Sequence, residues 1–221
     1  MADLSLQVGL LSSSVPARSG GLHYACARRG LDLLLGTALA LLALPVFLAA
    51  MIAVGLSGPG PVIFTQRRIG LRGRPFAMFK LRTMYHGAED DRQALQLLNE
   101  LDGPVFKIKV DPRITPVGRW LRRFSIDELP QLLNVIAGQM SLVGPRPLPA
   151  EETRIDTPAE RLRLSVKPGL TCLWQIAGRN EIPYREWIQL DCLYVEHRCL
   201  ALDLRILART PLVVLSGRGA Y

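Results

Sequence analysis

The feature that most constrains the fold is a stretch without any charged residue between Asp32 and Arg67. Its first part, residues 33–56, is almost wholly apolar. As a helix it would extend about 36 Å at ~1.5 Å per residue, enough to cross a hydrocarbon core of about 30 Å. A signal peptide fits poorly, because the run is too long and begins too far into the chain. A buried core helix need not be apolar on all sides, so the run predicts membrane embedding.

How this helix sits in the membrane is suggested by its flanks and its proline. Basic residues lie on both sides, with Arg28 and Arg29 before the run and Arg67 and Arg68 after it, which gives no positive-inside asymmetry. Pro45 lies mid-run, where it removes a helix hydrogen bond and imposes a kink. We therefore expect a re-entrant helix that bends and returns to the same face; an ordinary kinked span is the alternative.

The composition narrows the classes of partner. The chain has 27 Lys and Arg against 19 Asp and Glu, a net charge of +8, yet 49% of its residues are hydrophobic. Such hydrophobicity excludes intrinsic disorder. Only 6% of the residues are aromatic, so few side chains could stack on bases, which argues against a nucleic-acid-binding protein. A basic, apolar chain favours a membrane surface with anionic lipid, a phosphate-rich substrate, or both.

The four cysteines form no CxxC pair and the three histidines no HExxH spacing, so no metal site built from Cys and His is predicted. The cysteines are typical of reduced, partly buried thiols in a protein that faces the cytosol.

The chain divides into three parts: a mobile leader (residues 1–27), a membrane-embedded helix (28–57) and a larger region (58–221). The larger region predicts an α+β, mainly helical fold. It begins with a small basic β-hairpin, whose strands at 61–65 and 76–80 are joined by a Gly- and Arg-rich turn. Helices are expected at 88–101, at 117–124 and within 125–140. Two further helical runs within 187–215 suit a membrane interface.

Two adjacent carboxylates, Asp127 and Glu128, lie at the start of the helix expected within 125–140. Ser125-x-x-Glu128 is also a capping-box pattern, so a purely structural role is the alternative. Arg119, Arg122 and Arg123 precede the pair, and with the helix start they form an anion site for phosphates.

The chemistry expected of such a pair follows from its surroundings. An ionised carboxylate beside bound phosphates can attack phosphorus, and arginines and a helix dipole would keep it ionised. A neighbouring carboxylate can hold Mg²⁺, a hard cation that prefers carboxylates and substrate oxygens.

Further basic residues repeat this theme. Lys80 and Arg82 would share one face if the second strand continues, and Arg146 lies in a rigid Gly-Pro-Arg-Pro loop that restricts where its guanidinium points. Lys107, Lys109 and Arg113 are expected to be ordinary solvated charges, outside the first ring of site residues.

The order of these motifs resembles that of the bacterial sugar transferases, the monotopic phosphoglycosyl transferases that prime cell-surface polysaccharide synthesis. The matching stretches cover residues 28–221 in order: the apolar segment with Pro45, VIFTQRRIG, FKLRTM, DPRITPVGRWLRRFSIDELPQLLNVIAGQMSLVGPRP, RLSVKPGLT, GRN and RGAY. The resemblance implies a catalytic domain on the cytoplasmic face of the bacterial inner membrane, anchored by a re-entrant helix. Longer relatives carry extra transmembrane helices and a further domain, so this chain resembles the minimal catalytic unit.

The implied reaction transfers a sugar 1-phosphate from a UDP-sugar to undecaprenyl phosphate and releases UMP, with glucose or galactose the favoured sugars. By resemblance Asp127 attacks the β-phosphate to form a covalent intermediate, and Glu128 contributes to the Mg²⁺ site. Phosphate-binding positions fall on Lys80, Arg82, Arg122 and Arg146. The GRN stretch places Arg179 and Asn180 on the nucleotide or sugar side. A homodimer is also suggested, because relatives often pair.

Two residues depart from the family pattern: Leu44 stands where Ser often precedes the kinking proline, and Cys172 where Gly usually follows PGLT. Neither falls on the dyad. The rival function is a non-catalytic basic membrane-surface protein that binds anionic lipid or recruits a partner. That function explains the charge and the apolar helix, but it needs no carboxylates grouped with arginines and rigid loops.

Overall fold

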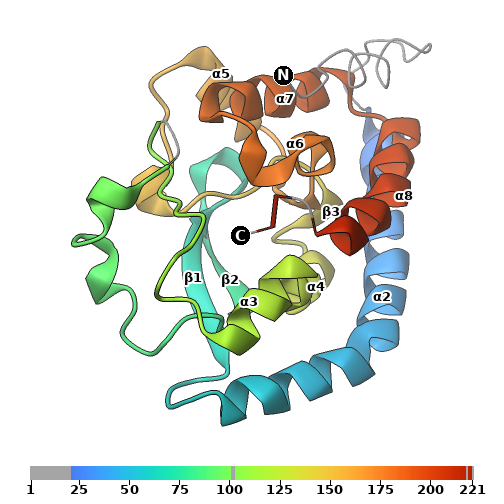
Figure 1. Ribbon diagram of the computed structural model, residues 1–221. Helices are drawn as coiled ribbons and strands as arrows, with labels where there is room; N and C mark the ends of the chain where they lie inside the picture. Colours follow the sequence, from blue (N-terminus) through green and yellow to red (C-terminus); the bar gives the residue numbers. More distant parts are fainter. Residues whose placement is uncertain (1–20, 101–102, 218, 221) are drawn as a thin grey trace.

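The computed structural model describes residues 21–100, 103–217 and 219–220, without the side chain of Asn180. The fold is α+β and mainly helical, with one long N-terminal helix beside a smaller body of short helices and two small sheets (Figure 1). The predicted leader lies outside the described residues as far as residue 20. From Leu22 onward the chain is helical, so the end of that predicted leader forms the first turns of the long helix.

Helix α2 runs from Leu22 to Leu56 and contains Pro45. It is long and apolar enough to cross a membrane by length and composition, and only 11% of its most apolar window is buried in the protein. Figure 1 shows it bent into two arms, the first beside α8 and the second along the lower edge of the molecule. An interior proline is a known cause of such a bend. Whether the helix is re-entrant stays a prediction.

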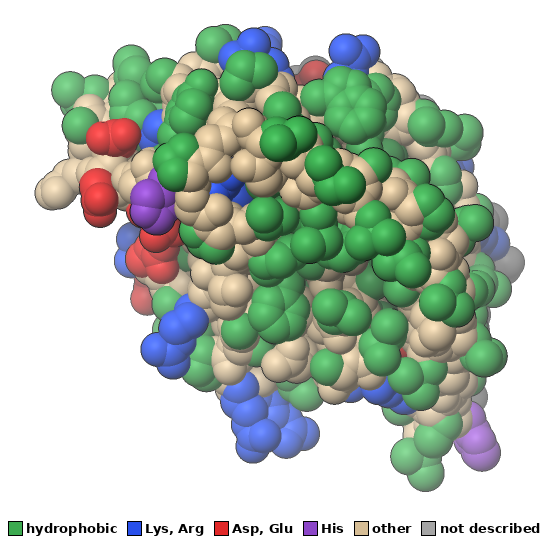
Figure 2. Space-filling view, turned by 90° about the horizontal axis from the view of Figure 1, so that it is seen from below, with side chains coloured by type: hydrophobic (Ala, Val, Ile, Leu, Met, Phe, Trp, Pro, Cys, Tyr) green, Lys and Arg blue, Asp and Glu red, His purple; other side chains and the backbone are tan. Residues whose placement is uncertain are grey.

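Much of the surface of α2 is exposed hydrocarbon. Leu34, Leu42 and Leu56 expose about three quarters or more of their surface. Seen from below, the face that holds the second arm is covered largely by hydrophobic side chains, with Lys and Arg toward its rim (Figure 2). An apolar surface this extensive marks a protein or membrane contact.

Both arms of α2 are fixed to the body. In the first arm, the Asp32 carboxylate accepts hydrogen bonds from the Ser141 hydroxyl at 2.9 Å and the Leu142 amide at 2.8 Å. In the second arm, Ala50 and Val54 are buried against Leu81. The helix is therefore part of the fold and not merely an attached anchor.

The predicted hairpin strands are present as β1 (Ile63–Ile69) and β2 (Pro75–Leu81), which pair antiparallel with Phe64 opposite Lys80. A short 3₁₀ turn, η1 (Leu71–Gly73), joins them. Strand β2 ends at Leu81, which matters for the two basic residues at positions 80 and 82.

The helix predicted at 88–101 is wrong. The described part of this segment holds only two 3₁₀ turns, η2 (Asp90–Arg92) and η3 (Gln96–Leu98). Arg92 forms ion pairs with the distant residues Glu151 and Glu152. Nearer along the chain, the Asn99 side-chain amide donates to the Val105 carbonyl at 3.1 Å. Tertiary contacts here outweigh a weak helix propensity.

Helix α3 (Pro116–Arg123) forms close to its predicted bounds, with the Thr115 hydroxyl accepting from the Gly118 amide at 2.9 Å as an N-cap. The following segment is not one amphipathic helix. It splits into a 3₁₀ turn, η4 (Ile126–Glu128), and a six-residue helix, α4 (Gln131–Ile136). Pro130 separates them, because proline has no amide hydrogen to continue the helix.

The two predicted C-terminal helical runs are α7 (Tyr184–His197) and α8 (Leu200–Ser216), and α8 continues through Pro211. Before them come short elements: β3 (Ser141–Val143), η5 (Ala150–Glu152), α5 (Pro158–Arg163), β4 (Gly169–Thr171), α6 (Leu173–Ala177) and η6 (Arg179–Glu181). β3 and β4 pair in parallel. A Cβ on Gly169 would lie 2.1 Å from the Gly144 amide nitrogen, so only glycine permits this approach.

The core lies between α6, α7, α8 and the β3–β4 pair. Its largest fully buried side chains are Met78, Met140, Leu142, Leu173, Tyr194, Leu202 and Ile206. Trp174 and Trp187 stack at 4.2 Å between ring centroids. Leu129, directly after the turn that carries both carboxylates, packs against this core.

Candidate active site

The carboxylate of Glu128 is held by two cations from different parts of the fold. The Arg146 guanidinium donates to both oxygens, at 3.2 Å from Nη1 to Oε2 and more closely from Nη2 to Oε1. Lys80, from β2, donates to Oε1 at 3.3 Å. A bidentate arginine–carboxylate contact is strong and directional, so η4, β2 and the Gly-Pro-Arg-Pro loop are tied together at this residue.

Asp127, one residue earlier, differs from Glu128 in the hydrogen bonding of its carboxylate. Its side chain is only 5% exposed, yet no described residue donates a hydrogen bond to its carboxylate. The capping-box alternative also fails, because Ser125 adopts a left-handed conformation with φ of 53° and makes no side-chain cap. The turn therefore carries two adjacent carboxylates of different kinds. That of Glu128 is engaged, meaning bonded to cations, and that of Asp127 is open, meaning without a hydrogen bond from a described residue.

The pKa values of the two carboxylates are shifted in opposite directions. Burial alone would raise the pKa of Glu128, but the charges and hydrogen bonds of Arg146 and Lys80 outweigh it and hold that pKa well below its usual range. Burial raises the pKa of Asp127, and the negative charge of Glu128 adds to this, against the opposing effect of Lys80. The sequence-based expectation that arginines and a helix dipole keep Asp127 ionised did not include this burial, which opposes the charged form. A raised pKa makes an ionised oxygen a better nucleophile.

Arg122 reaches the pair from α3. Its Nε donates to the Thr83 hydroxyl at 2.9 Å, while its terminal nitrogens donate to no described residue. Helix α3 can lie this close because residue 118 is glycine; a Cβ there would be 2.0 Å from the Thr83 carbonyl oxygen. Of the three arginines predicted to form the anion site, Arg122 is the one whose charge acts on Asp127. Arg119 and Arg123 are exposed.

The structure places Arg82 elsewhere. Its guanidinium donates to the carbonyls of Val54, Gly58 and Pro59 at 2.5–2.8 Å, where it satisfies carbonyls at the C-terminal end of α2. The expectation that it would share a face with Lys80 required β2 to continue, and the strand stops at Leu81. Arg82 is therefore a contact between the hairpin and the apolar helix.

Arg179 does join the site. Its Nη2 donates to the Ser125 hydroxyl at 3.2 Å, and burial lowers its pKa, with Glu128 and Arg146 among the charges that act on it. Both Arg179 and Ser125 have φ of 53°. Such strained residues cluster at functional sites. The side chain of Asn180, the other predicted residue of this stretch, lies outside the described part of the chain.

Sequence reasoning missed Lys107, which it placed among solvated charges. Burial lowers the pKa of Lys107 well below its ordinary value, and Arg146, Arg122 and Lys80 lower it further. Its ammonium lies 6.0 Å from the Trp187 ring centroid. Nothing local in its sequence signals this; the loop that carries it is held against the body by side chains from other segments.

Arg68 was also missed as a neighbour of the pair. Its Nη1 donates to the Pro147 carbonyl at 3.0 Å. Burial lowers its pKa to about 10, and Arg146 contributes to that shift. The two carboxylates thus lie among basic side chains from six segments, namely Arg68, Lys80, Lys107, Arg122, Arg146 and Arg179. Such a surplus of buried positive charge suits a ligand with several negative charges.

The fit of Mg²⁺ to this site depends on which oxygens are open. The described residues contain no group of three or more His, Cys, Asp or Glu side chains placed to hold a metal ion. Arg146 occupies both oxygens of Glu128, whereas those of Asp127 are open. Mg²⁺ commonly takes one or two carboxylates plus substrate phosphate oxygens. The donor set therefore fits a Mg²⁺ that is bound mainly by a phosphate substrate.

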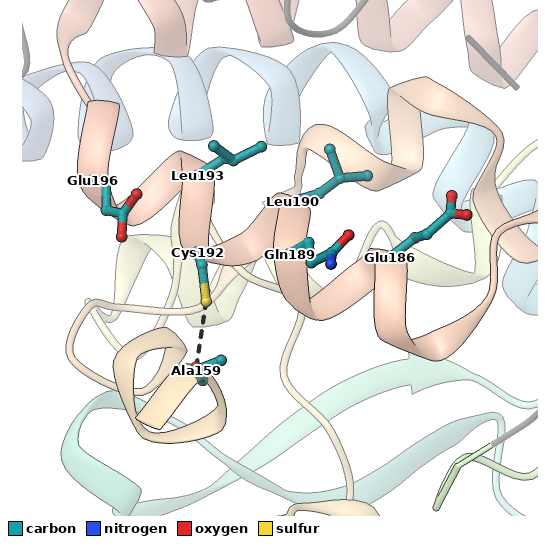
Figure 3. Close-up of a pocket in the computed structure, with 7 residues that line it drawn as sticks. All are labelled: Ala159, Glu186, Gln189, Leu190, Cys192, Leu193 and Glu196. Carbon is teal, nitrogen blue, oxygen red and sulfur yellow. Dashed lines mark hydrogen bonds between the residues drawn. The ribbon is translucent and has the colours of Figure 1, made fainter. Parts of the chain in front are cut away.

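A groove lies apart from the charged cluster, between α5 and α7 (Figure 3). This groove of about 350 Å³ is lined by Ala159, Glu186, Gln189, Leu190, Cys192, Leu193 and Glu196. The Cys192 thiol donates to the Ala159 carbonyl across it. It shares no residue with the charged cluster and offers no comparable set of charges.

The fold and the cluster together define a class: a protein with an apolar helix long enough to cross a membrane and a buried cluster of basic side chains around a carboxylate pair. Residues 23–217 match the bacterial sugar transferase family. The chain belongs to that family, which confirms the resemblance carried by its motifs.

Three relatives illustrate the match. The exopolysaccharide production protein ExoY of Rhizobium meliloti is 40% identical, with 88% of each chain covered. The undecaprenyl-phosphate galactose phosphotransferase of Salmonella typhimurium is 38% identical over 88% of this chain and 41% of its own length. The UDP-glucose:undecaprenyl-phosphate glucose-1-phosphate transferase of Xanthomonas campestris is 42% identical over 80% of this chain and 36% of its own. This chain thus spans less than half of the latter two proteins.

Proposed function

We propose that this protein transfers a hexose 1-phosphate, glucose- or galactose-1-phosphate, from a UDP-sugar to undecaprenyl phosphate and releases UMP. Relatives that carry these substrates in their names support the substrate class, and the relative ExoY supports a role in exopolysaccharide production. The surplus of cations around the carboxylates supports a diphosphate ligand.

The observation that carries the mechanism is the difference between the two carboxylates. Asp127 has open oxygens and a raised pKa, while Glu128 is fixed by Arg146 and Lys80. In the first step an Asp127 oxygen attacks the β-phosphorus of the UDP-sugar, and the bond from that phosphorus to the bridging oxygen breaks. UMP leaves with the electron pair, and the sugar phosphate is bound to Asp127 as an acyl phosphate.

In the second step an oxygen of undecaprenyl phosphate attacks the same phosphorus, and the acyl-phosphate bond breaks. This regenerates the Asp127 carboxylate and leaves the sugar on a lipid diphosphate. Because the intermediate separates the two displacements, nucleotide and lipid can occupy the site in turn.

The surrounding residues bind and stabilise charge. Arg122 offers its open guanidinium end to a phosphate oxygen, and Lys80, Arg146 and Lys107 add positive potential where charge develops in the transition state. Glu128 keeps Arg146 and Lys80 in position. Mg²⁺, when bound with the diphosphate, would be held mainly by the substrate's phosphate oxygens beside the open oxygens of Asp127, and it would neutralise phosphate charge.

The position at the membrane follows from the apolar face. We infer that α2 is embedded in the bacterial inner membrane with the body on the cytoplasmic side, where UDP-sugars are found. The second arm of α2 packs on β2 and α3, the elements that carry Lys80 and Arg122. A lipid-borne phosphate at the membrane surface would therefore be near the cationic cluster.

The decisive experiment is the first half-reaction, with purified protein in detergent, Mg²⁺ and radiolabelled UDP-glucose or UDP-galactose but no lipid acceptor. We expect up to one UMP per enzyme and label on the protein that hydroxylamine removes. Asp127→Asn keeps the shape of the side chain and should lower UMP release by at least about 10³-fold, because the nucleophile is lost.

Full turnover by Asp127→Asn would exclude the covalent route. Absence of UMP release with both nucleotide sugars, together with tight binding to anionic vesicles, would favour the non-catalytic membrane-surface protein instead.

A further inference from the structure

Arg146 is fixed at its backbone as well as at its side chain. The Arg163 guanidinium, at the end of α5, donates from Nη2 to the Arg146 carbonyl oxygen at 2.7 Å. The same guanidinium pairs with the Asp191 carboxylate of α7, at 2.9 Å between Nη2 and Oδ2 and 3.1 Å from Nε. A continuous chain of contacts therefore runs from α7 through α5 to the loop that carries Arg146.

Burying this ion pair costs free energy, because both charges are removed from water. The side chains of Arg163 and Asp191 are 6% and 1% exposed, and Asp191 Oδ1 is buried without a hydrogen bond. Burial raises the pKa of Asp191 to about 6, against the opposing charge of Arg163. Since buried ion pairs often stabilise a fold no better than apolar side chains would, stability alone does not account for this one.

The loop at the other end of the chain has little freedom. Pro145 and Pro147 restrict the backbone on both sides of Arg146. Gly144 lies so close to the 167–169 segment that an added Cβ would be 2.6 Å from the Lys167 carbonyl oxygen. With its carbonyl fixed by Arg163, the Arg146 side chain has a defined direction, toward Glu128.

We propose that Asp191 and Arg163 are positioning residues that act through Arg146: they fix its backbone so that its guanidinium engages Glu128 beside the open Asp127. They touch no substrate in this scheme, and their effect on the reaction passes through the orientation of Arg146. The inference rests on the proposed function for its kinetic readout, but its structural readout needs no turnover.

The kinetic test is a double-mutant cycle on the first half-reaction, with rates expressed per folded molecule. Asp191→Asn leaves Arg163 without a counter-charge and should slow UMP release about 10- to 100-fold, the cost of a misplaced catalytic group. In the Arg146→Ala background the same change should cost less than about twofold, because nothing remains to be positioned. An equal cost in both backgrounds would overturn the proposal.

A matched control is Asp203→Asn, another aspartate that is 1% exposed but bonds the Tyr24 and Tyr194 hydroxyls. It should destabilise the protein without slowing the half-reaction per folded molecule. If Asp191→Asn does not fold, Arg163→Lys takes its place in the cycle, since a single ammonium keeps the charge but loses the planar fork.

The structural readout is chemical modification of Arg146 by phenylglyoxal, followed by peptide mass spectrometry. Arg146 should be modified faster in Asp191→Asn than in wild type, because its guanidinium has come away from Glu128, while Asp203→Asn should match wild type. An unchanged rate at Arg146 overturns the relay even in a protein without transferase activity. Lack of UMP release by the wild type would instead count against the proposed function.

Discussion

Two buried clusters of charged residues in this molecule are built from similar side chains. They differ in how many of those side chains have hydrogen-bond partners. The first attaches α2 to the body: Arg28 donates to the Ser141 hydroxyl, which in turn donates to Asp32. Both oxygens of Asp203 accept from tyrosine hydroxyls. In the second cluster Glu128 is equally well bonded, but Asp127 has no hydrogen bond from a described residue, and the terminal nitrogens of Arg122 likewise have no described acceptor.

We infer from this contrast that the first cluster is structural and the second functional. A fold gains nothing from burying an open carboxylate among surplus cations, because unpaired buried charge is costly. A phosphate ligand would offset this free-energy cost, because it would supply the negative charge that the buried cations lack. Each of the following predictions tests whether the two clusters really differ in this way.

The largest effect on stability is expected within the functional cluster itself. Glu128→Gln leaves Arg146 and Lys80 as buried cations without a counter-charge, and should cost about 3–5 kcal/mol of unfolding free energy. Asp127→Asn breaks no described hydrogen bond and should cost far less. Thermal unfolding of the two variants at neutral pH measures the difference. Equal losses would mean that Asp127 is a structural residue like its neighbour.

The next prediction concerns the residue that sequence reasoning missed. Lys107→Ala should lower kcat/KM about 10²-fold, or ~2.7 kcal/mol, if its ammonium stabilises developing phosphate charge. Lys109, exposed in the same loop, is the control, and Lys109→Ala should stay within about twofold of wild type. Similar activities for both variants would place Lys107 outside the functional cluster.

The structural cluster should respond in the opposite way. Asp32→Ala leaves the Ser141 hydroxyl and the Leu142 amide without their acceptor, at a cost of about 1–3 kcal/mol. Chemical denaturation in detergent should show that loss. The half-reaction rate per folded molecule should remain near that of wild type, and a selective loss of rate would show that the two clusters are coupled.

The smallest effect is a shift in pH dependence. The folded-state pKa of Asp127 lies above its ordinary value of 3.8, and only the ionised form attacks phosphorus. The half-reaction rate should therefore fall as pH drops through that raised pKa. Lys80→Ala should move the midpoint up, since Lys80 lowers this pKa, and Glu128→Gln should move it down. Rate–pH profiles of the three proteins decide the matter.

Some of these features could be anticipated from the sequence. The apolar run, the hairpin and the two C-terminal helices are local patterns that the structure reproduces with shifted ends. Asp127, Glu128, Arg122 and Arg146 could be picked out because they stand in dense, ordered motifs, and the family they indicate is confirmed. The helix expected at 88–101 failed because the long-range ion pairs of Arg92 and the local hydrogen bond from Asn99 to Val105 hold that segment in another form.

The sequence by itself therefore determined the long apolar helix, the family and the adjacent carboxylate pair, because these depend on residue type and spacing along the chain. Only the tertiary structure decided which carboxylate is engaged and which is open, that Arg82 serves the end of α2, and that Lys107 is buried with its pKa lowered. The physical reason is that charges interact through space: the partners of Glu128 come from positions 80 and 146, and no periodicity in the chain encodes that meeting.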